Sequence, residues 1–310
     1  MDESSKKILI LAKNLCVNTL GLKVQKKAGQ EILFENLYDF WVPRYVELAI
    51  KKTPFVSEYI IYGVWKEDVK NYSKIIVFDS DVDKKTLRFF KKVGAQNKVV
   101  LSFLNKLNTR EKELHRSANK LGIKQVTYNM HDAKKFDITY VPQFWNRALA
   151  EEENTNRPLK WDIIFCGAAK KRLQVIREVE GRANEQGLKT NFWIVSKNKE
   201  RGTKEISRDY REYMNDVSMS CAILDIVGDE NWGLTWRPLE AIFSRKKLIT
   251  NYKDITKYDF YNNYKENILI LNKDNLNHIN DFIQKEYVPC DENFDEYDFS
   301  TWINKIEMLE

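Results

Sequence analysis

The chain has few cysteines, little glycine and no long hydrophobic run. Its four cysteines, Cys16, Cys166, Cys221 and Cys290, lie far apart and without CxxC spacing, so the sequence indicates neither a disulfide framework nor a zinc site. The apolar run from Ile8 to Ala12 is too short for a signal peptide or a transmembrane helix. We therefore expect a cytoplasmic protein.

Two nucleotide-binding fingerprints are also missing. The loop from Asn14 to Gly21, which follows the first predicted strand, holds no GxGxxG, and no Walker motif occurs, which argues against ATP hydrolysis. The 51 basic and 45 acidic residues leave a net charge of +6. A charge of this size does not by itself indicate nucleic acid, and none is expected as a partner, but it fits phosphate ligands or an anionic membrane surface.

The composition is that of a globular protein with large cores. Hydrophobic residues make up 43% of the chain and charged residues 31%, and its 310 residues are enough for two domains of ordinary size. Aromatic residues make up 13%, which suits the stacking of sugar rings and the filling of a core equally well. Composition therefore says little about function.

Short apolar runs alternate with helical patterns in both halves of the chain. This alternation predicts parallel sheets covered by helices on both faces. The predicted strands are residues 7–12, 75–78, 98–103, 125–128, 161–166, 191–195, 221–225, 248–250 and 267–271.

The predicted helices fall between these strands. They are residues 84–92, 109–121, a helix that ends near 187, 207–216, 238–243, 275–286 and 299–303 with Ser300 as its cap. Residues 31–52 are expected to form a long helix or a pair of helices interrupted at Pro43. The polar stretch from Ala150 to Arg157 predicts a domain boundary, which gives domains 1–150 and 151–310.

The most informative stretch is GDENWGLTWRPLEAIFSRKKLITN, from Gly228 to Asn251. It reads as a polar loop, a helix and a strand, and the loop follows a buried strand. In an open α/β sheet such a loop lies where ligands bind. Glu240, in the first helical turn, suits a sugar hydroxyl, whereas Arg237 and the neighbouring backbone N–H groups suit phosphate. The alternative is that Glu240 only caps a helix started by Pro238.

A second candidate anion site follows the strand 161–166. Gly167 is followed by Lys170, Lys171 and Arg172, at a turn from strand to helix. Backbone N–H groups at such a turn attract an anion, and nearby cations add charge. The alternative is a solvated basic first turn, which would oppose the helix dipole.

The stretch GLTWRPLEAIFSRKKLIT resembles the donor-binding segment of GT-B-fold glycosyltransferases, especially those of bacterial capsule, exopolysaccharide and lipopolysaccharide biosynthesis. In that family the glutamate of the segment holds the ribose, and the loop and helix hold the diphosphate of a nucleotide-sugar. The resemblance implies that Glu240 binds ribose. It implies a donor loop made of Gly233, Leu234, Thr235 and Arg237.

The same resemblance implies that Gly167, Lys170 and Arg172 hold the donor diphosphate. One position departs from the family's pattern. Retaining members usually carry a second acid eight positions before the glutamate, where this chain has Trp232, with Asp229 and Glu230 nearby. Retention or inversion of the sugar's configuration is therefore left open.

Three residues are candidates for the catalytic base that an inverting transferase needs. Asp79 and Asp81 follow the strand 75–78, and His131 follows the strand 125–128. Each has an ordinary alternative as a loop acid, a helix cap or a surface histidine. Asn14, Asn105, Trp232 and Trp236 are further candidates for contacts with the substrates.

The sequence Asp79-Ser80-Asp81 also resembles the metal-binding motif of GT-A transferases, where it would hold Mg²⁺ or Mn²⁺. The donor-like segment lies in the second half of the chain, as in GT-B proteins, and no cluster has metal-ligand spacing. We therefore expect neither a metal nor another cofactor.

Taken together, the resemblance implies two Rossmann-like domains that face each other across a cleft. The amino-terminal domain would bind a glycan or lipid-linked acceptor, and the carboxyl-terminal domain a nucleotide-sugar, with UDP expected as its nucleotide and a hexose transferred. Basic and aromatic residues would support peripheral contact with the inner face of the cell membrane. The alternatives are a non-catalytic protein that binds a nucleotide or glycan, and a sugar-nucleotide epimerase on the same fold.

Overall fold

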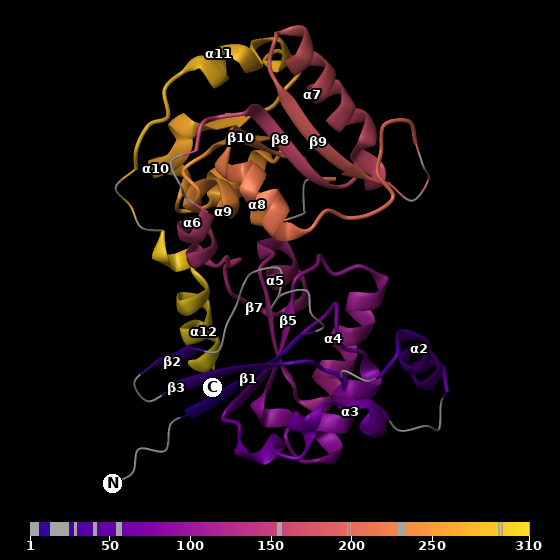
Figure 1. The fold of residues 1–310 in the computed structure, drawn as a ribbon. Coiled ribbons are helices and arrows are strands. Elements are labelled where there is room, and N and C mark those ends of the chain that lie inside the picture. The colour runs from indigo at the N-terminus through magenta and orange to yellow at the C-terminus, as the bar shows by residue number, and fades with distance from the viewer. Residues whose placement is uncertain are drawn as a thin grey trace. The chain divides into compact units, whose positions relative to one another are not determined.

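The computed structural model describes residues 6–12, 25–27, 30–39, 42–53, 58–153, 157–196, 198, 200–228, 233–290, 292 and 294–309. The chain divides into two compact units, each built around its own sheet (Figure 1). Unit 1 comprises Met1–Pro142 and Ile303–Glu310, and unit 2 comprises Gln143–Trp302. The division thus falls a few residues before the polar stretch after Ala150, and the end of the chain returns to unit 1.

Unit 1 contains a seven-stranded sheet in the order β2-β3-β1-β4-β5-β6-β7. Its strands pair in parallel except for β2, which runs antiparallel to β3. The bounds are β1 (Lys6–Leu11), β2 (Gln25–Lys27), β3 (Gln30–Glu35), β4 (Lys74–Phe78), β5 (Val99–Phe103), β6 (Lys124–Thr127) and β7 (Thr139–Tyr140). The continuous apolar runs of β1, β4 and β5 are buried, as expected for central parallel strands.

The prediction of a helix that starts at residue 31 is wrong for residues 31–35. Gln30–Glu35 forms β3, which pairs in parallel register with β1. The run Ile32-Leu33-Phe34 favours a strand, and pairing beside β1 buries Ile32. Helix α2 (Arg44–Lys52) begins only after Pro43, whose fixed backbone angle suits a helix start.

Among the residues that the structure describes, the other helices of unit 1 are α3 (Lys84–Lys92), α4 (Thr109–Leu121) and α5 (Met130–Phe136). The predicted bounds of α3 and α4 are confirmed. The carboxylate of Asp83 accepts the backbone N–H groups of Lys85 and Thr86 and so caps α3, and α4 ends at Gly122 with a φ of 69°. Short 3₁₀ turns, among them η1 (Glu58–Ile61) and η2 (Val64–Lys66), precede β4.

Unit 2 contains a five-stranded, wholly parallel sheet in the order β12-β11-β10-β8-β9. The strands are β8 (Trp161–Ala168), β9 (Thr190–Val195), β10 (Ser220–Asp225), β11 (Lys247–Thr250) and β12 (Ile268–Ile270). Each of them overlaps a strand predicted from the sequence.

Several helices pack against the sheet of unit 2, and the last helix of the chain begins in unit 2 and ends in unit 1 (Figure 1). The helices described in this part of the chain are α6 (Arg147–Glu153), α7 (Leu173–Glu185), α8 (Tyr210–Ser218), α9 (Trp236–Phe243), α10 (Tyr261–Tyr264), α11 (Ile279–Gln284) and α12 (Phe299–Glu307). Ser300 is not the cap of the last helix, because its own backbone N–H donates to the carboxylate of Asp298. No helix in the described ranges is long and apolar enough to span a membrane.

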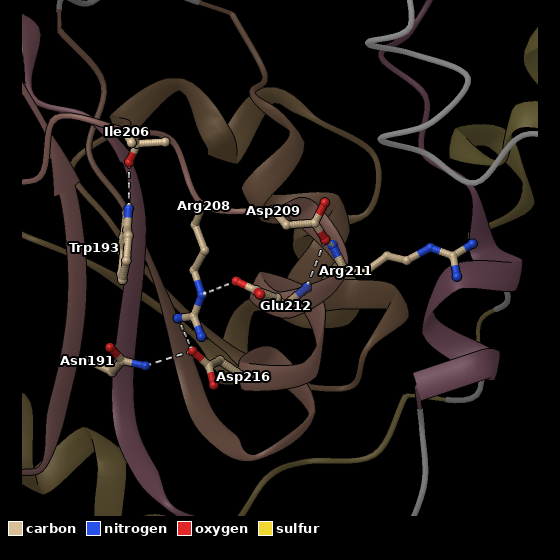
Figure 2. A network of polar contacts seen from close by, with 8 residues as sticks. All are labelled: Asn191, Trp193, Ile206, Arg208, Asp209, Arg211, Glu212 and Asp216. Atoms are coloured by element: carbon tan, nitrogen blue, oxygen red, sulfur yellow. Dashed lines mark hydrogen bonds and ion pairs between the residues drawn. The ribbon is translucent and has the colours of Figure 1, made fainter.

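The segment that leads into α8 pairs with the outer edge of β9 at the carboxyl end of that strand. The backbone N–H of Lys204 donates to the carbonyl of Ile194, and that of Ser196 donates to the carbonyl of Lys204. Figure 2 shows how Arg208 fastens this segment: its guanidinium pairs with Asp216 and lies over the ring of Trp193. The carboxyl end of this strand edge is thus paired with the chain's own backbone, and Arg208 holds the pairing segment in place.

Candidate functional site

The candidate site lies at the carboxyl ends of β8 and β10. If β8 is numbered 1 and β12 is numbered 5, the strand order across the sheet of unit 2, starting at β9, is 2-1-3-4-5. The connection from β8 runs to β9 on one side, and the later connections run through β10 to the other side. The direction therefore switches between β8 and β10. In open α/β sheets ligands bind outside the carboxyl ends of the strands at this switch point. Gly167 stands at the end of β8, and Asp225 at the end of β10.

Two arginines converge on Gly167. A Cβ atom built on Gly167 would lie 3.1 Å from Nη2 of Arg237 and 3.9 Å from Nη2 of Arg172. The Arg237 guanidinium donates to the carbonyl of Cys166. That of Arg172 donates to the carbonyl of Ala168 at 2.9 Å and also to that of Ile226, so it links the ends of β8 and β10. A Cβ atom at position 167 would crowd the guanidinium group of Arg237 and touch that of Arg172.

The charges at this point favour an anionic ligand. Burial lowers the pKa of Arg172, the neighbouring Arg237 lowers it further, and Asp225 opposes the shift. The Nε atom of Arg172 is buried and has no hydrogen-bond partner within the described part of the chain. Two like charges this close repel each other. An anion with several oxygens would relieve the repulsion by accepting hydrogen bonds from both guanidinium groups.

Asp225 shapes the start of helix α9. Its buried carboxylate accepts the hydroxyl groups of Thr235 at 3.0 Å and Thr250 at 3.1 Å. Burial raises the pKa of Asp225, although Arg237 and the two hydroxyls oppose the shift. Thr235 is the N-cap residue of α9, yet its hydroxyl bonds Asp225 and not the first helical turn. The amino end of α9 therefore keeps its backbone donors without a side-chain cap.

Glu240 is the centre of a buried hydrogen-bond network. Its side chain is 0% exposed, and its two oxygens accept the hydroxyls of Tyr210 at 2.7 Å and Tyr213 at 2.8 Å. Nη1 of Arg237 lies 3.5 Å from the oxygen bonded by Tyr213, and the indole of Trp145 donates to Tyr210 at 2.9 Å. Glu240 therefore faces two phenols and one guanidinium.

The pKa values in this network follow from burial and from Glu240. Burial, and then the Glu240 carboxylate, raise the pKa of Tyr210 and that of Tyr213 well above their ordinary value, so both phenols stay protonated and donate. Burial alone would lower the pKa of Arg237, but Tyr213 and Glu240 outweigh it and the pKa is raised. The network keeps the guanidinium charged and fixed beside Gly167.

The comparisons with known proteins concern the fold. No protein-family model matches the sequence, and no curated protein sequence matches it either. An alpha-glucosyltransferase, solved in complex with UDP and a 13-mer DNA containing a central A:G mismatch, is similar over 91% of this chain and 90% of that chain, with 11% identity and a TM-score of 0.59. An alpha1,3-fucosyltransferase with GDP matches 99% of this chain and 91% of that chain at 10% identity, with a TM-score of 0.44.

This chain has the fold of that glucosyltransferase. The predicted fold class, α/β with two Rossmann-like domains of the GT-B type, is confirmed by this likeness together with the two parallel sheets. At 11% identity the likeness shows the fold alone.

Several residues predicted for the donor site do lie together. Gly167, Arg172, Thr235, Arg237 and Glu240 are joined by the contacts described above. Their roles toward a ligand remain predictions.

The other predicted donor residues lie around this group. Gly233 has a φ of 82°, in the region that favours glycine, and makes the turn before α9. The buried Leu234 follows it, and its carbonyl accepts from the Gln143 amide. Lys170 has an exposed side chain on the turn before α7. Asp229, Glu230 and Trp232 fall outside the described residues.

Asp79, at the carboxyl end of β4 in unit 1, is turned toward a loop. Its side chain is 0% exposed. Its carboxylate accepts the backbone N–H of Leu104 at 2.8 Å and the side-chain amide of Asn105 at 3.0 Å. Asp132 holds the same loop from the other side by accepting the backbone N–H of Leu107 at 2.8 Å. The loop from Leu104 to Asn108 is therefore fixed by two buried carboxylates.

The remaining base candidates differ in exposure. Asp81 is buried, and its carboxylate accepts the hydroxyl of Ser80, whereas His131 is exposed on α5. Asn105 is exposed at the end of β5, and Asn14 lies outside the described residues. Among the residues that the structure describes, no group of three or more His, Cys, Asp or Glu is placed to hold a metal ion.

Replacing Asp79 with asparagine is expected to stabilise the protein at neutral pH. Burial raises the pKa of Asp79 to about 6, despite the hydrogen bonds from Leu104 and Asn105. The folded state therefore binds this proton more tightly than the unfolded chain, so the ionised carboxylate opposes folding above about pH 6 and ceases to do so toward pH 4. Asp79→Asn should raise the free energy of unfolding by roughly 1–3 kcal/mol at pH 7.5 and have little effect near pH 4.

Urea unfolding of both proteins across this pH range measures the effect. An asparagine variant that is less stable at every pH would show that the charged hydrogen bonds outweigh burial. The same variant tests the catalytic prediction, because loss of a general base lowers the rate by about 10²–10⁴.

Proposed function

We propose that the chain is a glycosyltransferase that moves a hexose from a nucleoside-diphosphate sugar, with UDP as the first candidate nucleotide, to a glycan or lipid-linked oligosaccharide. One observation carries the proposal: Arg172 and Arg237 converge on Gly167 at the switch point of the unit 2 sheet. Guanidinium forks are the side chains best suited to bind phosphate oxygens in pairs. The uncapped amino end of α9 supplies backbone donors at the same edge.

These groups would act on the leaving group. Transfer of the sugar breaks the bond between its anomeric carbon and the diphosphate, which departs with added negative charge. Arg172, Arg237 and the α9 donors would stabilise that charge in a site arranged in advance. Holding the acceptor hydroxyl near the anomeric carbon would supply much of the remaining acceleration. Asp79, Asp81 and His131 stay the predicted candidates for the base, and no metal is required.

The fold supports this class of donor, because the similar glucosyltransferase was solved with UDP. The biological setting we propose is the assembly of capsule, exopolysaccharide or lipopolysaccharide in the cytoplasm. The acceptor would be carried on a lipid at the inner face of the membrane. The resemblance of residues 233–250 to the donor-binding segment of such transferases supports this setting.

A ligand screen followed by a transfer assay tests the proposal. We expect UDP, GDP, CMP or dTDP, with or without its sugar, to raise the unfolding temperature, and Arg172→Ala to remove the shift. Lys189→Ala is a matched control, because it removes an exposed cation elsewhere in unit 2. Glycan and lipid-linked acceptors, together with duplex DNA, then test whether the sugar is transferred.

Each outcome decides between the alternatives. Transfer that requires an acceptor supports the transferase. Conversion of the nucleotide-sugar without any acceptor would assign an epimerase, and binding without turnover would assign a non-catalytic binding protein. No shift with any nucleotide at millimolar concentration would overturn the proposed donor site.

A further inference from the structure

The positive charge of the chain is concentrated in one segment of unit 1. Residues 84–120 hold eleven Lys or Arg against two Glu, a net charge of +9, so the rest of the chain is net negative although the whole carries +6. This segment contains α3 and α4, which pack against each other and are bridged by an ion pair between Lys84 and Glu113 at 2.6 Å. A charge separation this large marks a surface for an anionic partner.

The exposed face of these two helices is basic. On α3, residues at positions 84, 88, 91 and 92 lie on one side of the helix, opposite the buried Leu87 and Phe90. On α4, Arg116 and Lys120 are exposed one turn apart. The exposed cations are Lys84, Arg88, Lys91, Lys92, Arg116 and Lys120. We name these six residues the basic face.

Exposed apolar side chains gather beside the basic face. Five of the large exposed hydrophobic residues in the described part of the chain fall between positions 45 and 64. They are Tyr45 (73% exposed), Leu48 (46%), Tyr59 (40%), Ile60 (57%) and Val64 (67%), on α2, η1 and η2. We name these five residues the apolar patch.

Direct contacts join the elements that carry the apolar patch to helix α3, which carries most of the basic face. The ring of Tyr59 lies 5.9 Å from that of Phe89 on α3. The ammonium group of Lys85 on α3 donates to the carbonyls of Ile50 and Thr53 at the end of α2, at 2.9 and 2.8 Å. Figure 1 shows α2, α3 and α4 gathered in one region of unit 1. The apolar patch and the basic face therefore belong to one continuous surface.

From these observations we infer that α2, η1, η2 and α3 form a docking surface for an anionic lipid bilayer, with α4 extending its basic side. Apolar side chains of the patch enter the boundary of the acyl chains, and the cations of the basic face contact the anionic headgroups. Nucleic acid would use the basic face alone and leave the apolar patch in water. This inference does not depend on the transferase assignment, because it concerns a different surface.

Vesicle sedimentation with the full chain tests the inference. We expect binding to phosphatidylcholine vesicles that contain phosphatidylglycerol, weaker binding to phosphatidylcholine alone, and a decrease with added salt. The triple variant Arg88→Glu, Lys91→Glu and Lys92→Glu should bind the anionic vesicles at least about 100-fold more weakly, since each lost surface cation contributes about fivefold and each added glutamate is repelled by the headgroups. Ile60→Ser with Val64→Ser should weaken binding about tenfold at any lipid composition.

Matched controls change the same chemistry in unit 2. Lys265→Glu with Lys273→Glu, and Ile206→Ser, alter exposed side chains there and should leave vesicle binding unchanged. Thermal unfolding confirms that the variants fold. Failure to bind anionic vesicles, or equal loss in the controls, would overturn the inference. So would binding to duplex DNA that is tighter than to vesicles and insensitive to the serine substitutions, which would assign the basic face to nucleic acid.

Discussion

Replacing Arg237 with alanine is expected to lower the affinity for the nucleoside diphosphate by about 10²-fold or more. The affinity for the bare nucleoside should stay within roughly twofold of that of the parent protein. The reason is that the guanidinium stands beside Gly167, where we place the phosphates and not the base or ribose. Isothermal titration calorimetry with the matching nucleoside and nucleoside diphosphate measures both affinities. Arg237→Lys keeps the charge but loses the planar fork, so its effect should be intermediate.

A suitable control for this experiment is Arg182→Ala, which removes an exposed arginine that pairs with Glu185 on α7. It should change neither affinity. An equal loss of nucleoside and diphosphate binding in Arg237→Ala would contradict the placement of the phosphates. It would indicate instead that removing Arg237 disturbs the whole site, because Glu240 would lose its charge partner.

The second large effect is expected on stability. Glu240→Gln should lower the free energy of unfolding by about 3 kcal/mol, because a buried guanidinium loses its anionic partner and one tyrosine hydroxyl must face an amide that donates. Tyr213→Phe should cost about 1–2 kcal/mol, since Glu240 then accepts one hydrogen bond fewer. Urea unfolding measures both changes. Glu212→Gln should cost close to nothing, because the Glu212 side chain is exposed and lies 3.6 Å from Arg208, which keeps its pairing with Asp216.

This experiment also separates two roles of Glu240. As the centre of the buried network, Glu240 holds Arg237, so the glutamine variant should lose diphosphate affinity and keep nucleoside affinity. The sequence resemblance instead implies a direct contact with the ribose. A variant that is as stable as the parent protein but binds the nucleoside poorly would support that contact and contradict the positioning role.

Much of the fold could be predicted from local patterns. Continuous apolar runs such as Ile75-Ile76-Val77-Phe78 identify buried parallel strands, and Asp83 marks the start of α3 through its cap. Local patterns failed to predict the strand Gln30–Glu35, because the apolar residues of this segment continue the helical spacing of the residues that follow it. Pairing with β1 decides the structure of that segment, and this partner is distant in sequence.

The arrangement of the candidate site could be predicted only in part, because several of its residues come together from distant parts of the chain. Arg172 and Arg237 stand in or beside recognisable turns, so sequence reasoning found them. Asp225 was missed although it carries nearly the same signal as Asp79, an acid at the carboxyl end of an apolar strand. Tyr210 and Tyr213 carry no such signal, because they meet Glu240 from 30 and 27 residues away.

The pairing at the end of β9 has a consequence for the protein at high concentration. An uncovered outer strand presents a row of unused backbone groups on which another copy can add its own strand, the first step toward an ordered aggregate. Here the segment before α8 occupies the end of that row, at Ile194 and Ser196, and Arg208 secures it to Asp216 and over Trp193. The template that unit 2 offers a neighbouring molecule along β9 is therefore shortened at its carboxyl end.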